Sequence, residues 1–168
     1  MKKIMLSVLL SSLLAACASQ EAKDTSKAAV EDRSGQQGQQ AATSGAASNP
    51  LKDPSNILSK RSVYFDFDKS NVKDEYKPMV EAHAKYLTGH ADAKVTVQGN
   101  TDERGSREYN IALGQRRADS VKKMMNVLGV ADKQIETVSL GEEKPKAEGH
   151  DEAAWHQNRR ADLVYQGE

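Results

Sequence analysis

The stretch KVTVQGNTDERGSREYNIALGQRRADSVKKMMNVLG, residues 94–129, contains a strand, a loop and a helix in succession. Val95 and Val97 alternate with polar neighbours, which is the period of a half-buried strand. Residues 108–128 place apolar side chains at helical spacing, and a glycine follows them. The polar residues 99–105 therefore form a loop that joins the carboxyl end of a strand to the start of a helix.

The same two periods continue on both sides of this stretch. Val63, Phe65 and Phe67 alternate with polar residues, as in a strand. In chain order we expect strands at 63–67, 94–98, 135–140 and 161–165, long helices at 76–87 and 108–128, and a short helix at 151–155. This βαβαβ(α)β order predicts an α/β (α+β) two-layer sandwich, with a mixed sheet and helices on one face.

The N-terminus has the layout of a secretory signal peptide. A positive start, Met1-Lys2-Lys3, precedes an apolar run at residues 4–14, which is shorter than the roughly 20 residues that span a membrane. Leu14-Ala15-Ala16-Cys17 ends the run, and this cysteine is alone in the chain, so it cannot form an internal disulfide. The segment resembles a bacterial lipobox, which implies a lipoprotein signal peptide at 1–16 and a covalent lipid on Cys17.

The next part of the chain is poor in apolar residues. From Ala18 to Pro54 the composition is mainly Ser, Ala, Gln, Gly and charged residues, with no aromatic side chain. Such a segment buries too little apolar surface to offset the entropy of ordering it. We expect a lipidated cysteine and a disordered tether at 17–54, followed by one folded domain at 55–168.

Charge and motif content argue against several classes of function. The chain has 24 basic and 24 acidic residues, so it lacks the basic excess that nucleic-acid binding uses to neutralise phosphates. It contains no Gly-x-Ser-x-Gly, no Gly-x-x-x-x-Gly-Lys-Ser/Thr and no His-Glu-x-x-His motif. We expect no nucleic-acid partner, no metal and no cofactor apart from the covalent lipid, and no nucleophilic, nucleotide-dependent or zinc-protease chemistry.

Arg117 does not fit the helix in which it lies. It occupies the apolar stripe, four residues after Leu113 and four before Val121. A guanidinium keeps its charge, so its head must reach water or a carboxylate. One interpretation is that the aliphatic stem packs while the head lies at the rim.

Two aspartates follow the expected strands. Asp68 comes after the first strand and Asp102 after the second, and ligands gather where loops leave the carboxyl ends of strands. Opposite charges in one pocket would suit a zwitterion, with its carboxylate on Arg117 and its ammonium on Asp102. The alternative, in which Asp102 caps the turn and pairs internally with Arg104 or Arg117, stays open.

Several spaced motifs agree with one family. They are Phe65–Asp68, Gly99–Gly105, Asn110–Leu113, Arg117-Ala118 and Asn158–Arg160. Together they resemble the OmpA-like peptidoglycan-binding domain, over roughly residues 62–165. Many members of that family carry histidine where this chain has Asn100, so no histidine role is carried over to this position.

The resemblance implies a ligand, the meso-diaminopimelate of uncrosslinked peptidoglycan stem peptides. Its ammonium would bind Asp102 and its carboxylate Arg117. Phe67, Asp68 and Leu113 would line the pocket, and Thr101 would add a hydrogen bond.

The resemblance also implies a place in the cell and partners. It predicts a non-catalytic lipoprotein of the outer membrane that faces the periplasm, ties that membrane to the cell wall and serves envelope integrity and cell division. The TolB propeller and other Tol proteins would be its protein partners. Two other functions stay open: a wall hydrolase that uses Asp66, Asp68 or Asp102 as acid and base, and a lipoprotein that only docks proteins.

Overall fold

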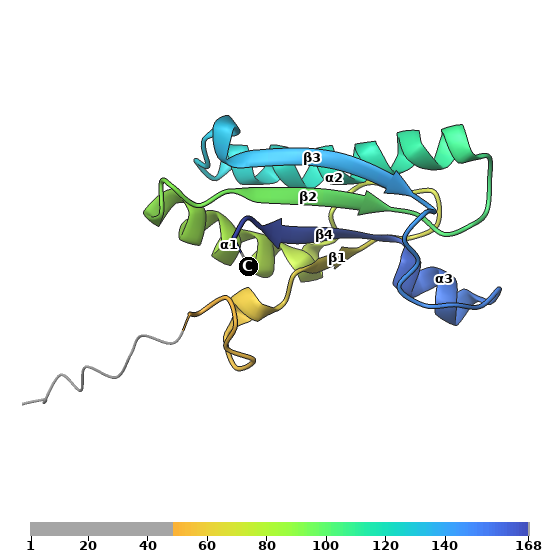
Figure 1. Ribbon diagram of the computed structural model, residues 1–168, viewed down its shortest axis with the longest axis horizontal. Coiled ribbons are helices and arrows are strands. Elements are labelled where there is room, and N and C mark those ends of the chain that lie inside the picture. Colours follow the sequence, from red (N-terminus) through yellow and green to blue (C-terminus); the bar gives the residue numbers. More distant parts are fainter. Residues whose placement is uncertain (1–48, 168) are drawn as a thin grey trace, which may run out of the picture. The chain divides into compact units, whose positions relative to one another are not determined.

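Four strands form one mixed sheet in the computed structural model, which describes residues 49–167 (Figure 1). The strand order is β1-β4-β2-β3, with β4 antiparallel to both of its neighbours and β2 parallel to β3. It follows that β1, β2 and β3 run in one direction and end at the same end of the sheet. The strands are β1 Ser62–Tyr64, β2 Val95–Asn100, β3 Ile135–Gly141 and β4 Arg160–Tyr165.

Two long helices lie on one face of this sheet, behind the strands in the view of Figure 1. The helices are α1 Lys77–Gly89, α2 Arg107–Val127 and α3 Glu152–Asn158, and short 3-10 turns occupy Ile57–Ser59, Asp74–Tyr76 and Asp132–Gln134. The predicted α/β fold with a mixed sheet is confirmed. None of the helices within residues 49–167 has both the length and the apolar character that crossing a bilayer requires.

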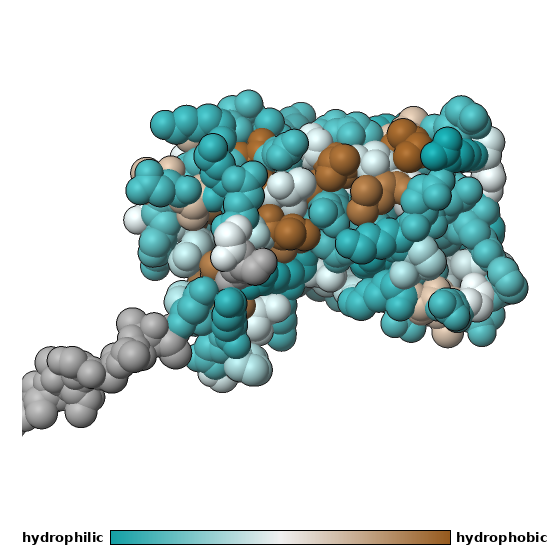
Figure 2. Space-filling view, viewed as in Figure 1, coloured by the Kyte–Doolittle hydropathy of each residue, from teal (hydrophilic) through white to brown (hydrophobic). Residues whose placement is uncertain are grey.

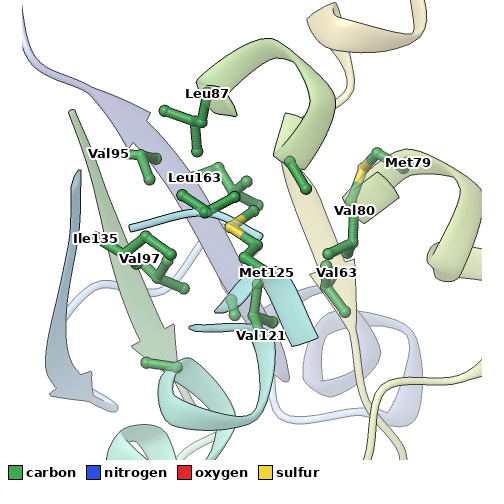
Figure 3. Close-up of a cluster of buried hydrophobic side chains, with 14 of the residues drawn as sticks. Val63, Met79, Val80, Leu87, Val95, Val97, Val121, Met125, Ile135 and Leu163 are labelled. Carbon is green, nitrogen blue, oxygen red and sulfur yellow. The ribbon is translucent and has the colours of Figure 1, made fainter. Parts of the chain in front are cut away.

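The core lies between the sheet and these two helices. Val95, Val97 and Leu163 point from the strands toward α1 and α2, where they meet Leu87 and Val121 (Figure 3). The opposite face of the sheet is mainly hydrophilic, with hydrophobic residues scattered over the strands (Figure 2). The alternation in the sequence therefore separates a core face from an exposed face, as expected for a half-buried sheet.

The first strand is shorter than its alternation predicts. β1 ends at Tyr64, and Phe67, expected on the strand, has 58% of its surface exposed. After Phe65 the chain turns, because Asp68 adopts a left-handed backbone with φ of 54° and Lys69 N–H bonds back to the Asp66 carbonyl. The prediction that the strand extends to Phe67 is wrong, since a turn takes this residue out of the sheet.

Packing begins before residue 55. Leu51 is buried in the core cluster, and the Arg61 guanidinium donates to its carbonyl at 2.8 Å. The folded part thus includes residues that the expected boundary placed in the tether. The expected signal peptide, Cys17 and residues 18–48 lie outside the described residues.

Candidate ligand-binding site

The carboxyl ends of β1 and β2 and the first turns of α2 enclose a cavity of about 230 Å³. All six residues that the sequence nominated for a pocket line this one cavity, and Arg104, Gly105 and Tyr109 complete its wall. The convergence follows from the topology, since parallel strands deliver their following loops to the same end of the sheet. The nominated residues are Phe67, Asp68, Thr101, Asp102, Leu113 and Arg117.

Arg117 lies entirely below the surface. Its Nε donates to the Lys69 carbonyl at 2.9 Å, its Nη1 to the Asn100 carbonyl at 2.8 Å, and its Nη2 to the Asp66 carbonyl at 3.2 Å. A guanidinium has five N–H groups, so two remain without a partner among the described residues. Arg117 therefore ties together the loops that follow β1 and β2 while it lines the cavity.

Burial decides the electrostatics of Arg117. It lowers the pKa of the guanidinium to about 10, although the nearby Asp102 carboxylate acts in the opposite direction. The group is still a cation at neutral pH. The interpretation in which only the stem packs and the head reaches the rim is wrong, because backbone carbonyls rather than water solvate the charge.

Asp102 is a buried carboxylate with two arginine partners. Its Oδ2 accepts from Arg104 Nη2 at 2.6 Å and from Arg159 Nη1 at 3.3 Å, and its Oδ1 accepts from the Arg104 backbone N–H at 3.2 Å. Burial raises its pKa, but the hydrogen bonds from Arg104 and Arg159 outweigh this and hold the pKa below its ordinary value. The alternative in which Asp102 pairs internally with Arg104 is therefore observed. Asp102 and Arg117 share the cavity without pairing directly with each other.

Aromatic rings form the rim. The Arg104 guanidinium lies between the ring of Phe67, at 4.2 Å from its centroid, and the ring of Trp155, at 4.0 Å. Tyr109 also lines the cavity, and its hydroxyl donates to Asp68. The left-handed backbone of Asp68 directs this carboxylate to the rim, a conformation that Asn and Asp tolerate better than other side chains with a Cβ.

Two polar atoms of the cavity wall have no hydrogen-bond partner among residues 49–167. They are Thr101 Oγ1 and Arg104 Nε, both buried. An unpartnered buried polar group costs about 1–3 kcal/mol, so such atoms are rare unless something outside the protein satisfies them. Their position in the wall is that of groups which bind a ligand.

The sequence did not nominate Tyr109 for the cavity, and it considered Arg104 only as an internal partner of Asp102. Tyr109 could have been found, because it precedes Leu113 by four residues and so extends the stripe that holds Arg117. Arg159, next to the start of β4, pairs with Asp102 and Glu152. Within residues 49–167, no three His, Cys, Asp or Glu side chains are grouped as metal ligands.

The fold belongs to a known class of domain. A model of the OmpA family matches residues 64–159, more than half of the 168 residues, so the chain belongs to the OmpA family. The peptidoglycan-associated lipoprotein of Pasteurella multocida is 58% identical over 61% of this chain and 69% of that protein. Within the family, the chain thus groups with the peptidoglycan-associated lipoproteins.

Solved structures agree with this assignment. The crystal structure of the peptidoglycan-associated lipoprotein from Burkholderia pseudomallei has a TM-score of 0.69 and 59% identity, over 70% of this chain and 100% of that chain. The C-terminal domain of Helicobacter pylori MotB, at 20% identity, has a TM-score of 0.60 over 65% of this chain and 86% of that chain, and shows the shared fold.

Proposed function

We propose that the cavity binds the free side-chain end of meso-diaminopimelate in uncrosslinked peptidoglycan stem peptides. The observation that carries the proposal is that side chains of opposite charge line one cavity of about 230 Å³. Asp68 and Asp102 are acidic, and Arg117 is basic. Diaminopimelate carries an ammonium and a carboxylate on one carbon at this end, so one ligand can satisfy both signs. The relatives named for an association with peptidoglycan support the same ligand class.

Each part of the ligand has a partner in the wall of the cavity. The ligand carboxylate would accept from the two N–H groups of Arg117 that bind no carbonyl. The ammonium would donate to Asp102, with Asp68 near it at the rim. Thr101 Oγ1, now without a partner, would complete the polar contacts, while Leu113 contributes apolar surface.

The pKa directions speak against the hydrolase. Glycoside hydrolysis needs one carboxylic acid that keeps its proton near neutral pH, and a raised pKa provides it. The pKa of Asp102 is lowered despite burial, and Lys73, at 2.8 Å, lowers the pKa of Asp66. The arrangement therefore favours binding without catalysis.

Attachment to the membrane completes the proposed function. A multiply acylated Cys17 would anchor the chain in the outer membrane, and the segment that follows it would tether the folded domain to that membrane. The domain could then hold the cell wall from the periplasmic side and so serve envelope integrity and cell division. Family resemblance adds TolB and other Tol proteins as partners.

We expect Cys17→Ala protein to leave the membrane fraction, and its retention there would contradict the lipid anchor.

Co-sedimentation with purified peptidoglycan tests the ligand. Asp102→Asn removes one charge-assisted contact, worth about 1.5–3 kcal/mol, so binding to diaminopimelate-containing peptidoglycan should fall roughly 10- to 100-fold. Asp119→Asn, on the exposed side of α2, is the matched control and should bind like wild type. Circular dichroism verifies that both variants fold. Wild-type binding by Asp102→Asn would contradict the assignment, and release of soluble fragments would favour the hydrolase.

A further inference from the structure

The carboxylate proposed to bind the ligand ammonium already holds a cation of the protein itself. The contact from Arg104 Nη2 to Asp102 Oδ2, at 2.6 Å, is shorter than either of the other two hydrogen bonds to this carboxylate. A carboxylate offers about four lone-pair sites, and three are occupied before any ligand arrives. A ligand ammonium therefore competes with an arginine for Asp102.

Arg104 is the partner of Asp102 that can move. Arg159 is held in place, because its side chain is buried and also donates to the Phe65 carbonyl and to Glu152. The Arg104 side chain is 31% exposed at the rim of the cavity.

The surroundings of Arg104 offer it a second position. Its guanidinium lies between the rings of Phe67 and Trp155, which attract a cation through their faces whichever way its edge points. Glu152 Oε2 lies 3.9 Å from Arg104 Nη2 and could accept it after release from Asp102. Arg104 Nε is buried and has no hydrogen-bond partner in the described part of the chain, so the present position does not satisfy the whole group.

We propose that Arg104 is a specificity-determining residue, a resident cation on Asp102 that the ligand ammonium must displace. When the ligand ammonium replaces the Arg104 guanidinium on the same carboxylate oxygen, the net gain in binding free energy is small. A ligand with only an ammonium therefore binds weakly, whereas a ligand that also brings a carboxylate to Arg117 gains a contact with no competitor. The inference rests on the proposed function, and it explains how the cavity selects a zwitterion over a simple amine.

Charge balance in the cavity supports this role. Its wall contains two acidic residues, Asp68 and Asp102, and two basic ones, Arg104 and Arg117, which matches a ligand end with no net charge. Loss of Arg104 would leave the wall with an excess negative charge. Such a cavity would accept a simple cation more readily.

Two soluble stem tripeptides test the proposal, one ending in meso-diaminopimelate and one in lysine. They differ in the side-chain carboxylate, while both carry the side-chain ammonium. Calorimetry should show that wild type prefers the diaminopimelate peptide. In Arg104→Gln, affinity for the lysine peptide should rise about tenfold, because its ammonium no longer competes with an arginine. The diaminopimelate peptide should gain little, because its carboxylate loses the attraction of the same cation, so the preference should shrink by a similar factor.

Arg107→Gln is the matched control, because Arg107 is exposed, pairs with Glu143 and lies outside the cavity wall. It removes the same charge from the same segment and should leave both affinities unchanged. If Arg104 had only a structural role, Arg104→Gln would lower the affinities for both peptides by the same factor and keep the ratio of these affinities. That result would overturn the proposal.

The binding data distinguish an error in the proposed ligand from an error in the role of Arg104. If wild type binds neither peptide, or binds both equally, the proposed ligand is wrong. If wild type discriminates and Asp102→Asn loses binding, but Arg104→Gln keeps the wild-type ratio, only the role of Arg104 is wrong.

Discussion

The backbone of Gly114 in α2 lies directly against the backbone of Gly99 in β2. A Cβ built on Gly99 would fall 1.8 Å from the Gly114 carbonyl oxygen, and a Cβ on Gly114 would fall 2.3 Å from Ser139 Oγ. No side chain fits between the helix and the strand at this point. The close approach sets the position of Arg117, which lies one turn further along α2 and reaches the carbonyl of Asn100, the residue after Gly99.

Gly114→Ala should therefore damage both stability and binding. The added methyl group forces α2 away from the sheet, and overpacking of this kind costs about 1–3 kcal/mol. Urea unfolding should show the loss, and affinity for the diaminopimelate peptide should fall because Arg117 is displaced. Gly89→Ala is the control, since a Cβ there meets nothing within 4 Å. Equal stability of the two variants would contradict the close contact.

The backbone at Asp68 predicts a trade-off between stability and binding. With φ of 54°, this position favours Gly, Asn or Asp, and an ordinary side chain costs roughly 1–2 kcal/mol there. Asp68→Asn should keep wild-type stability but bind the diaminopimelate peptide more weakly, because it loses the charge at the rim. Asp68→Ala should lose both stability and affinity for the diaminopimelate peptide. Unfolding curves and calorimetry separate the two effects, and an alanine variant as stable as wild type would argue against strain.

His83 should make stability depend on pH. Its Nε2 lies 2.8 Å from the Lys60 carbonyl and must donate to it, so Nδ1 accepts from the Tyr165 hydroxyl, also at 2.8 Å. Burial lowers the pKa of this ring below its ordinary 6.5, although the bond to Lys60 acts in the opposite direction. Below pH 6.5 the unfolded chain then binds a proton that the folded chain resists.

Stability should thus fall as the pH drops below 6.5 toward the lowered pKa of His83. The ring resonances of His83 in NMR spectra should titrate below those of a free histidine, and urea midpoints should fall between pH 7 and pH 5. In His83→Gln the slope of stability against pH should be smaller. A normal titration of His83 would contradict its buried neutral form.

His150 should titrate in the opposite direction. Its exposed ring pairs with Glu103 at 2.7 Å, which raises the pKa of His150, and Trp155 Nε1 donates to the same carboxylate at 2.9 Å. Glu103→Gln should return the His150 pKa toward its ordinary value in an NMR titration. It should also change Trp155 fluorescence. Glu148→Gln, a charge change nearby in the chain, should leave both signals unaltered.

The core makes a simpler prediction. Leu87 is fully buried between α1 and the sheet, so Leu87→Ala should cost about 2–5 kcal/mol of unfolding free energy (Figure 3). Val127, with 81% of its surface exposed at the end of α2, is the control, and Val127→Ala should change stability little. Urea unfolding of both variants measures the difference.

Local patterns in the sequence determined the order of the elements and singled out Arg117, Asp68 and Asp102, while the family resemblance added Phe67, Leu113 and Thr101 to the cavity. The periods of 2 and 3.6 residues depend on neighbours in the chain, so they identified both long helices and the four strand regions. The helical spacing identified Arg117 as a charge in an apolar stripe. The strand period identified Asp102 as a residue that follows a strand. These inferences needed no knowledge of distant contacts.

Only the tertiary structure decided how the charges are partnered. β4 lies between β1 and β2, and this brings Arg159 to Asp102, 57 residues earlier in the chain. The turn at Asp68 moves Phe67 from a strand to the rim, where it stacks on Arg104. Sequence spacing specifies which way a side chain faces on its own element. The solvation of a buried charge depends on which carbonyls and carboxylates other elements bring to it, and those become known only when the sheet is assembled.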